Sequence, residues 1–174
     1  MARILHTERL SVRTLEEGDA GFMLALLNDP SWLRMIGDRG VRTESQARDY
    51  IRDGAMASYV LLGYGFYLVQ LKGSGIPAGI CGLAKRDYLE DPDIGFAFLP
   101  QYRGQGYAHE AAAAMLDYAR GTLKMQRILA TTRPYNDSSA RLLNKLGLRF
   151  ERRIPHPNGE GELMLFATAD STVC

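Results

Sequence analysis

The segment 93–132 constrains the fold of this 174-residue chain more than any other. It reads as a strand over 93–99, a glycine-rich turn, a helix that ends near Arg120, and a second strand over 127–132. A strand–helix–strand crossover within one sheet is almost always right-handed and joins parallel strands. We therefore expect these two strands to be parallel neighbours.

The rest of the chain alternates between strand-like and helix-like periodicity, with no repeat or low-complexity tract. The short connection 72–75 predicts a hairpin, and Gly147 is well suited to end a helix. We expect strands at 10–15, 66–71, 76–85, 149–154 and 162–167, and helices at 17–28, 43–57 and 136–146. This order predicts a single α+β (mixed α/β) domain that spans residues 1–174.

Composition excludes several classes of protein. The chain has 21 basic and 20 acidic side chains, a formal charge of +1, which argues against binding to a nucleic-acid backbone. Cys81 and Cys174 are far apart and in no metal-ligand spacing, so neither a metal site nor a disulfide framework is expected. The uncharged stretch 54–71 is interrupted by glycines and reads as a helix end, a loop and a buried strand. We expect a cytoplasmic protein with no membrane partner.

The turn after the strand 93–99 is the first candidate site. Gly104 and Gly106 precede a helix, so backbone N–H groups at its start can meet a phosphate or pyrophosphate, and Arg103 adds a cation. The alternative is a tight turn with no ligand. A dinucleotide-binding fingerprint fits poorly, because its third glycine falls at His109, and the Gly-Lys-Ser/Thr of a P-loop is absent.

Three motifs in order resemble the GCN5-related N-acetyltransferase (GNAT) superfamily over residues 7–168. The turn Gln101-x-x-Gly104-x-Gly106 matches the Q/R-x-x-G-x-G/A motif that binds the pyrophosphate of acetyl-coenzyme A in that family. The second signature corresponds to Asn136-x-x-Ser139-x-x-Leu142-Leu143-x-Lys145-Leu146-Gly147-Leu148, with Leu148 where the family has Phe. The start, Thr7-Glu8-Arg9-Leu10-x-Val12-Arg13 with Asp19, Asn28-Asp29-Pro30 and Trp32, resembles the ribosomal-protein N-terminal (RimJ/RimL-type) acetyltransferases.

The resemblance implies a twisted, mostly antiparallel sheet with one splayed parallel strand pair, flanked by about four helices. It implies an enzyme that moves the acetyl group of acetyl-CoA directly to a primary amine of a protein N-terminus or a small molecule, without a metal. Relatives often pair, so a monomer and a homodimer are both open. A non-catalytic acyl-CoA-binding or sensor module and a different nucleotide-binding protein are the alternatives.

The same resemblance implies which residues hold the cofactor. The backbone of Phe98 and Leu99 would pair with the pantetheine arm, and an N–H there would polarise the thioester. Asn136 would bind the pantetheine or cap its helix. The cofactor-binding set is Phe98, Leu99, Gln101, Arg103, Gly104, Gln105, Gly106, Tyr107, Ala108, Asn136 and Ser139.

Ser139 and Asp93 are the candidate catalytic residues. Leu143 stands where many relatives have a tyrosine acid, whereas the ribosomal-protein branch has a serine at the position of Ser139. Ser139 would protonate the leaving thiolate or, alternatively, cap its helix. Asp93 would take the proton of the amine or, with Glu90 and Asp91, form a solvated acidic turn.

The acceptor pocket is expected outside the cofactor motifs, in the segments 29–42 and 154–161. Trp32, Arg34 and Ile36 are the candidate substrate-binding residues, since they could hold an apolar group and an anion together. Core packing is the alternative for Trp32 and Ile36.

Overall fold

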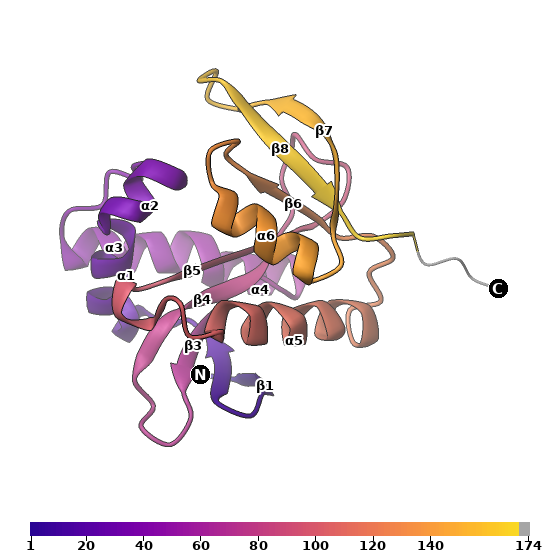
Figure 1. Ribbon diagram of the computed structural model, residues 1–174. Helices are drawn as coiled ribbons and strands as arrows, with labels where there is room; N and C mark the ends of the chain where they lie inside the picture. Colours follow the sequence, from indigo (N-terminus) through magenta and orange to yellow (C-terminus); the bar gives the residue numbers. More distant parts are fainter. Residues whose placement is uncertain (171–174) are drawn as a thin grey trace.

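The computed structural model describes residues 1–170, in which eight strands form one sheet with helices on both faces (Figure 1). The strand order is β1-β2-β3-β4-β5-β6-β8-β7. The strands are β1 (Arg3–His6), β2 (Leu10–Thr14), β3 (Phe66–Leu71), β4 (Pro77–Ala84), β5 (Asp93–Phe98), β6 (Leu129–Thr132), β7 (Arg149–Pro155) and β8 (Glu162–Ala167).

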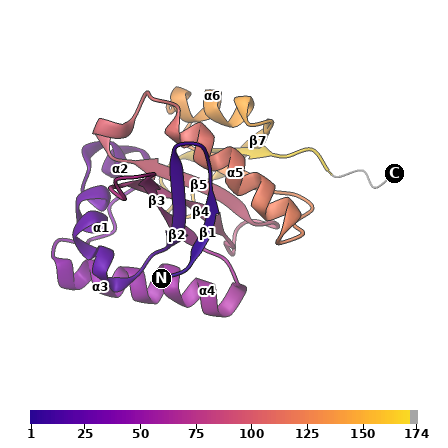
Figure 2. The ribbon, with the colours of Figure 1, turned by 90° about the horizontal axis from the view of Figure 1, so that it is seen from below.

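The helices form two layers. They are α1 (Ala20–Leu27), α2 (Pro30–Met35), α3 (Glu44–Ile51), α4 (Ala57–Leu62), α5 (Tyr107–Gly121) and α6 (Asp137–Lys145). A π-helical turn, Arg52–Met56, joins α3 to α4, and short 3-10 turns lie at Glu17–Asp19 and Pro100–Tyr102. Figure 2 shows α5 and α6 on one side of the sheet and α3 and α4 on the other.

The parallel pair β5–β6 is the feature that makes room for a site. Their register is recorded only at Asp93 and Leu129, where the Leu129 N–H donates to the Pro92 carbonyl at 2.9 Å. Every other recorded neighbour pair in the sheet is antiparallel. The predicted splayed parallel pair in a mostly antiparallel sheet is therefore confirmed.

Several expected elements differ in extent. Strand β1 was not expected, and α2 lies in a segment expected to be a connection. Pro30 opens α2, and the Asp29 carboxylate accepts from the Trp32 N–H at 3.3 Å, a local N-cap that the sequence analysis missed. The helix expected to end at 57 continues to Leu62. Counting α3 through α4 as one helix gives five in the described residues, against about four expected.

Two apolar clusters hold these layers together. One lies between the sheet and α5 and α6, and it includes Met115, Leu143 and Phe166. The other lies between the sheet and α1, α2 and α3, and it includes Met23 and Ile51. Burying one such side chain stabilises the fold by about 1.5–3 kcal/mol. Because the clusters lie on opposite faces, they show which face each β5 side chain occupies.

The uncharged stretch 54–71 becomes the end of the π turn, α4 and β3. Within residues 1–170, no helix is long and apolar enough to cross a membrane. Cys81 is buried with a free thiol, and Cys174 lies outside the described residues.

Candidate active site

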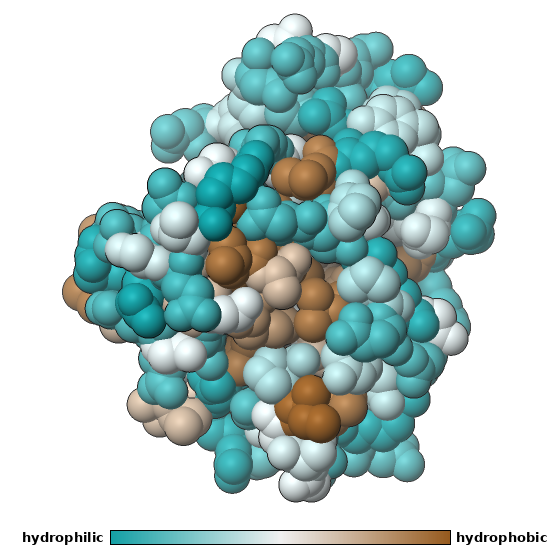
Figure 3. Space-filling model, turned by 90° about the vertical axis from the view of Figure 1, so that its left-hand side faces the viewer, coloured by the Kyte–Doolittle hydropathy of each residue, from teal (hydrophilic) through white to brown (hydrophobic). Residues whose placement is uncertain are grey.

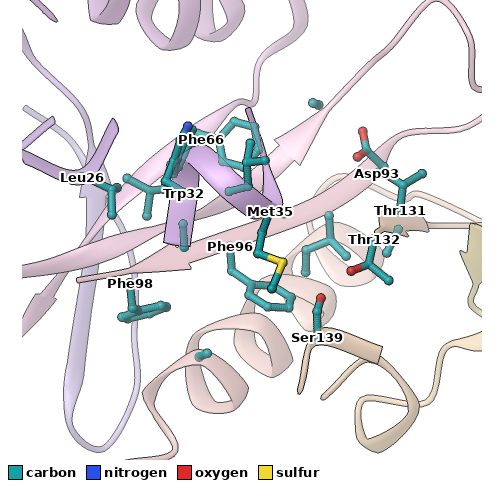
Figure 4. Close-up of a pocket in the computed structure, with 18 of the residues that line it drawn as sticks. Leu26, Trp32, Met35, Phe66, Asp93, Phe96, Phe98, Thr131, Thr132 and Ser139 are labelled. Carbon is teal, nitrogen blue, oxygen red and sulfur yellow. The ribbon is translucent and has the colours of Figure 1, made fainter. Parts of the chain in front are cut away.

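A cavity of about 1070 Å³ opens where β5 and β6 diverge. Its walls come from these two strands, the turn before α5, α2, α6 and the loop between β7 and β8. Figure 3 shows an apolar patch recessed in this face and bordered by hydrophilic residues. In Figure 4, Trp32 and Phe66 lie on one side of β5, and Phe98 and Ser139 lie on the other.

The glycine turn presents an open helix N-terminus to this cavity. Gly104 and Gly106 adopt left-handed φ angles of +71° and +82°, which disfavour residues with a Cβ. A Cβ at Gly104 would meet nothing within 4 Å, so the space beside it is open. Gly106 provides no side-chain cap, and the first N–H groups of a helix have no partner within the helix. These groups fit an incoming pyrophosphate.

A clamp from the start of the chain holds this turn in place. The Glu110 carboxylate accepts from the Thr7 hydroxyl at 2.5 Å, from the Arg9 N–H at 2.8 Å and from the Arg9 Nε at 2.7 Å. Arg9 also donates to the Gln105 carbonyl at 2.9 Å and lies over the Tyr107 ring at 4.4 Å. Glu110 therefore has a structural role in holding the turn, and the role of Arg9 was missed.

Arg103 is held in place rather than freely extended. Its Nη2 donates to Asp29 at 2.6 Å, and its Nε donates to the Phe98 carbonyl at 2.9 Å. The guanidinium thus ties the turn to the beginning of α2, and its contact with the cofactor stays a prediction. Tyr102 and Tyr107 pack against the α5-side core.

The exposed backbone edge of β5 is set by its pairing with β4. The Leu99 N–H donates to the Ala78 carbonyl at 3.0 Å, so it is engaged within the sheet and cannot serve as the predicted donor. Backbone groups alternate in direction along a strand, and the recorded register with β4 is regular, so the N–H groups of Phe96 and Phe98 point toward the divergence from β6. Sequence reasoning identified Phe98 but missed Phe96, because only the register settles which residues alternate toward the gap.

On α6, the cap and the hydroxyl have separate roles. Asn136 Oδ1 accepts from the Ser139 N–H at 3.2 Å and from the Ser138 hydroxyl at 3.2 Å, so Asn136 is the N-cap. The Ser139 hydroxyl has no hydrogen-bond partner among the described residues, and Ser139 lines the cavity. The buried Thr132 hydroxyl, which also lines the cavity and is also without a partner within residues 1–170, was missed. Leu143 is buried in the core.

Asp93 is buried, with 3% of its surface exposed, which contradicts the solvated acidic turn for this residue. Its carboxylate accepts from Arg86 Nε at 3.1 Å. Burial raises the pKa of Asp93 above its ordinary value, although the Arg86 charge opposes the shift. Asp91 is not part of this pair, because its Oδ2 lies 3.9 Å from Arg127 Nε.

Trp32, Arg34 and Ile36 all line the cavity, together with His156 and Pro157 of the β7–β8 loop. Trp32 is also part of the core, and its Nε1 is buried without a partner among the described residues. The structure therefore brings together the two segments that were expected to form the acceptor pocket.

The two candidate catalytic residues lie on opposite faces of the sheet at the divergence. Ile94 and Phe98 belong to the α5-side cluster, whereas Ala97 packs against the cluster under α1 to α3. Because side chains alternate, Asp93 shares the face of Ala97. Ser139 is on α6, on the other face. A donor molecule and an acceptor can therefore meet from opposite sides.

Comparison with known proteins identifies the family. Residues 9–149 match the family model of the acetyltransferase (GNAT) domain. The uncharacterized N-acetyltransferase YnaD of Bacillus subtilis is 31% identical over 87% of this chain and 88% of its own length. The chain belongs to the GNAT acetyltransferase family, as its motifs predicted.

Solved structures share the fold. A GNAT-family acetyltransferase from Bacillus anthracis is 30% identical, with a TM-score of 0.78 over 95% of this chain and 97% of its own. The ribosomal L7/L12 alpha-N-protein acetyltransferase RimL, solved with coenzyme A, is 17% identical, with a TM-score of 0.82 over 97% and 98%. The predicted RimJ/RimL-like architecture is confirmed at the level of the fold.

Proposed function

We propose that this protein is an enzyme that transfers the acetyl group of acetyl-CoA directly to a primary amine. The observation that carries the proposal is the cavity at the β5–β6 divergence. It joins the open α5 N-terminus to the Asp93 carboxyl and the Ser139 hydroxyl, which lie on opposite faces of the sheet. The acceptor is a small molecule or a peptide N-terminus, the latter being the substrate class in the name of RimL.

Cofactor binding is assigned to the turn and the β5 edge. The N–H groups from Gly104 to Ala108 would hold the pyrophosphate. The N–H groups of Phe96 and Phe98 would pair with the pantetheine arm and donate to the carbonyl oxygen that gains negative charge. Acetyl-CoA supplies the activated acetyl group as a thioester, and no metal is required.

Proton transfer is assigned to Asp93 and Ser139. Asp93 accepts the proton of the amine, directly or through a water molecule, so that the nitrogen can form the new C–N bond. As the C–S bond breaks, Ser139 donates a proton to the sulfur and recovers one from solvent. The raised pKa of Asp93 makes it a stronger base than an exposed aspartate.

Thiol release from acetyl-CoA, measured with a panel of amines and of peptides with free N-termini, tests the proposal. Burial raises the pKa of Cys81 to about 12, so this thiol should react slowly, and a blank without acceptor removes its background. We expect release that depends on the acceptor. Binding of acetyl-CoA without release for any acceptor would instead favour a non-catalytic acyl-CoA-binding module. We expect the enzyme to act in the cytoplasm as a monomer or a homodimer.

A further inference from the structure

We call the part of the cavity lined by the segments 29–42 and 154–161 its acceptor end. Arginines without carboxylate partners lie at this end. Arg34 and Arg39 both line the cavity, and neither guanidinium forms a hydrogen bond or ion pair with a described residue. Arg133, directly after β6, is the third. Its Nε is buried without a partner in residues 1–170, and its Nη1 donates to the Glu160 carbonyl at 3.1 Å.

Two of these arginines share the cavity with a histidine. Arg39, Arg133 and His156 line the same cavity, and Arg133 also donates to the Glu160 carbonyl in the loop that begins at His156. Burial lowers the pKa of His156, and the positive charges of Arg133 and Arg39 lower it further. Burial raises the pKa of Tyr88, and the positive charge of Arg39 opposes the shift. Tyr88 and Asp93 line the same cavity, and the negative charge of Asp93 contributes to the pKa of Tyr88. The cationic end of the cavity is therefore next to the candidate base.

Nearby carboxylates do not neutralise this cluster. Asp93 is paired with Arg86 at 3.1 Å, and Asp38 is paired with Arg42 at 2.6 Å. Glu160 is the acidic residue of the β7–β8 loop, and its negative charge raises the pKa of His156. Its side chain accepts a hydrogen bond from Asn158 at 3.5 Å. One carboxylate thus faces two arginines and a histidine of lowered pKa, which leaves a net positive end of the cavity.

Part of the cavity lining is apolar. Trp32, Met35 and Phe66 line the cavity, as Figure 4 shows. A planar guanidinium is suited to carboxylate and phosphate groups, with which it forms paired, charge-assisted hydrogen bonds. A polyamine would be repelled by the same charges.

We propose that the acceptor is an anionic amine, a small molecule that carries a carboxylate or phosphate group besides its primary amine. Arg39 and Arg133 hold the anionic group, and the amine lies toward Asp93. This inference rests on the proposed function, because it names the substrate class of the same site.

Equilibrium binding to the protein saturated with coenzyme A tests the inference separately from turnover. The probes are α-amino acids, ω-amino acids and amino phosphates, each matched with the carboxamide or alcohol that lacks the anion. Spermidine serves as a cationic amine, and short acidic peptides with free N-termini serve as the peptide alternative. Loss of a charge-assisted contact should weaken binding about 10–100-fold. We expect that preference for at least one anionic probe, and we expect Arg39→Gln and Arg133→Gln each to remove most of it.

Arg42→Gln is the matched control, because Arg42 is in the same segment but is paired with Asp38 outside the cavity lining. It should keep the preference. Equal binding of anionic and neutral probes, tighter binding of spermidine, or acidic peptides bound in place of free anionic amines would overturn the inference. Thiol release measured in parallel distinguishes the two proposals. Selective binding without release would contradict the proposed function alone, and release with neutral amines would contradict the substrate class alone.

Discussion

The glycine turn and the acceptor end of the cavity differ in how their side chains are satisfied. Around the turn, Arg9, Arg103 and Glu110 are all engaged in hydrogen bonds or ion pairs with other parts of the chain. At the acceptor end, Arg39 has no partner among the described residues, and the buried nitrogens of Trp32 and Arg133 have none either. One end is held rigid by the protein itself, and the other leaves donors for a ligand.

The difference fits the two ligands proposed for the two ends of the cavity. Backbone N–H groups bind a pyrophosphate whatever the side chains, provided that the turn is held in one conformation. Recognition of an acceptor depends on side chains that contact it directly, and a ligand that satisfies buried donors gains more than one that leaves them unpaired.

Gly104→Val should give the largest effect, because it adds a branched side chain at a φ of +71° in the space assigned to the pyrophosphate. We expect acetyl-CoA affinity to fall more than about 100-fold, as measured by calorimetry. Gly73→Val is the control, since Gly73 has a φ of +88° in the β3–β4 hairpin and equally open surroundings. Similar affinity for both variants, with folding verified by circular dichroism, would show that the turn does not hold the cofactor.

Asp93→Asn should lower kcat by about 100-fold or more while acetyl-CoA affinity is retained, since it removes the base and keeps the shape. A base works deprotonated, so kcat at saturating acceptor should fall as pH drops through the raised pKa of Asp93. As the pH falls, the wild-type enzyme should therefore begin to lose activity at a pH above the ordinary aspartate range. The variant should lack this pH dependence. An unchanged profile would assign the proton transfer elsewhere.

Ser139→Ala should reduce kcat by about 10-fold or more, with little change in acetyl-CoA affinity. Ser138→Ala is the matched control one residue away, because the Ser138 hydroxyl donates to the cap residue Asn136. Equal turnover of the two variants would assign no proton transfer to Ser139.

Glu110→Gln should give the smallest effect. It weakens the clamp on the turn without touching the cofactor, so we expect a rise of up to about 5-fold in KM for acetyl-CoA and an unchanged kcat. The effect should grow at low ionic strength, because Arg9 is exposed and its attraction to Glu110 is screened by salt. A fall in kcat instead would mean that the clamp also orients the reacting groups.

Much of the region around the glycine turn and α6 was predictable, because its sequence signals are local. The turn 101–106, the N-cap Asn136 and the helix end at Gly147 each depend on residues within one or two turns of the chain. Hydrophobic periodicity likewise predicted strands β3 to β8, apart from small shifts at their ends. The Asp29 cap of α2 was local too, but its short helix has too few turns to show a clear periodicity.

The amino-acid sequence by itself determined the family, the order of the principal strands and helices, and the glycine turn before α5. Tertiary structure alone decided which N–H groups of β5 are free, because that depends on its register with β4. It also decided the burial of Asp93 and the placement of Arg39, Arg133 and His156 in one cavity. Turns and periodicity are encoded by neighbouring residues, whereas burial and charge clusters arise only when distant segments pack together.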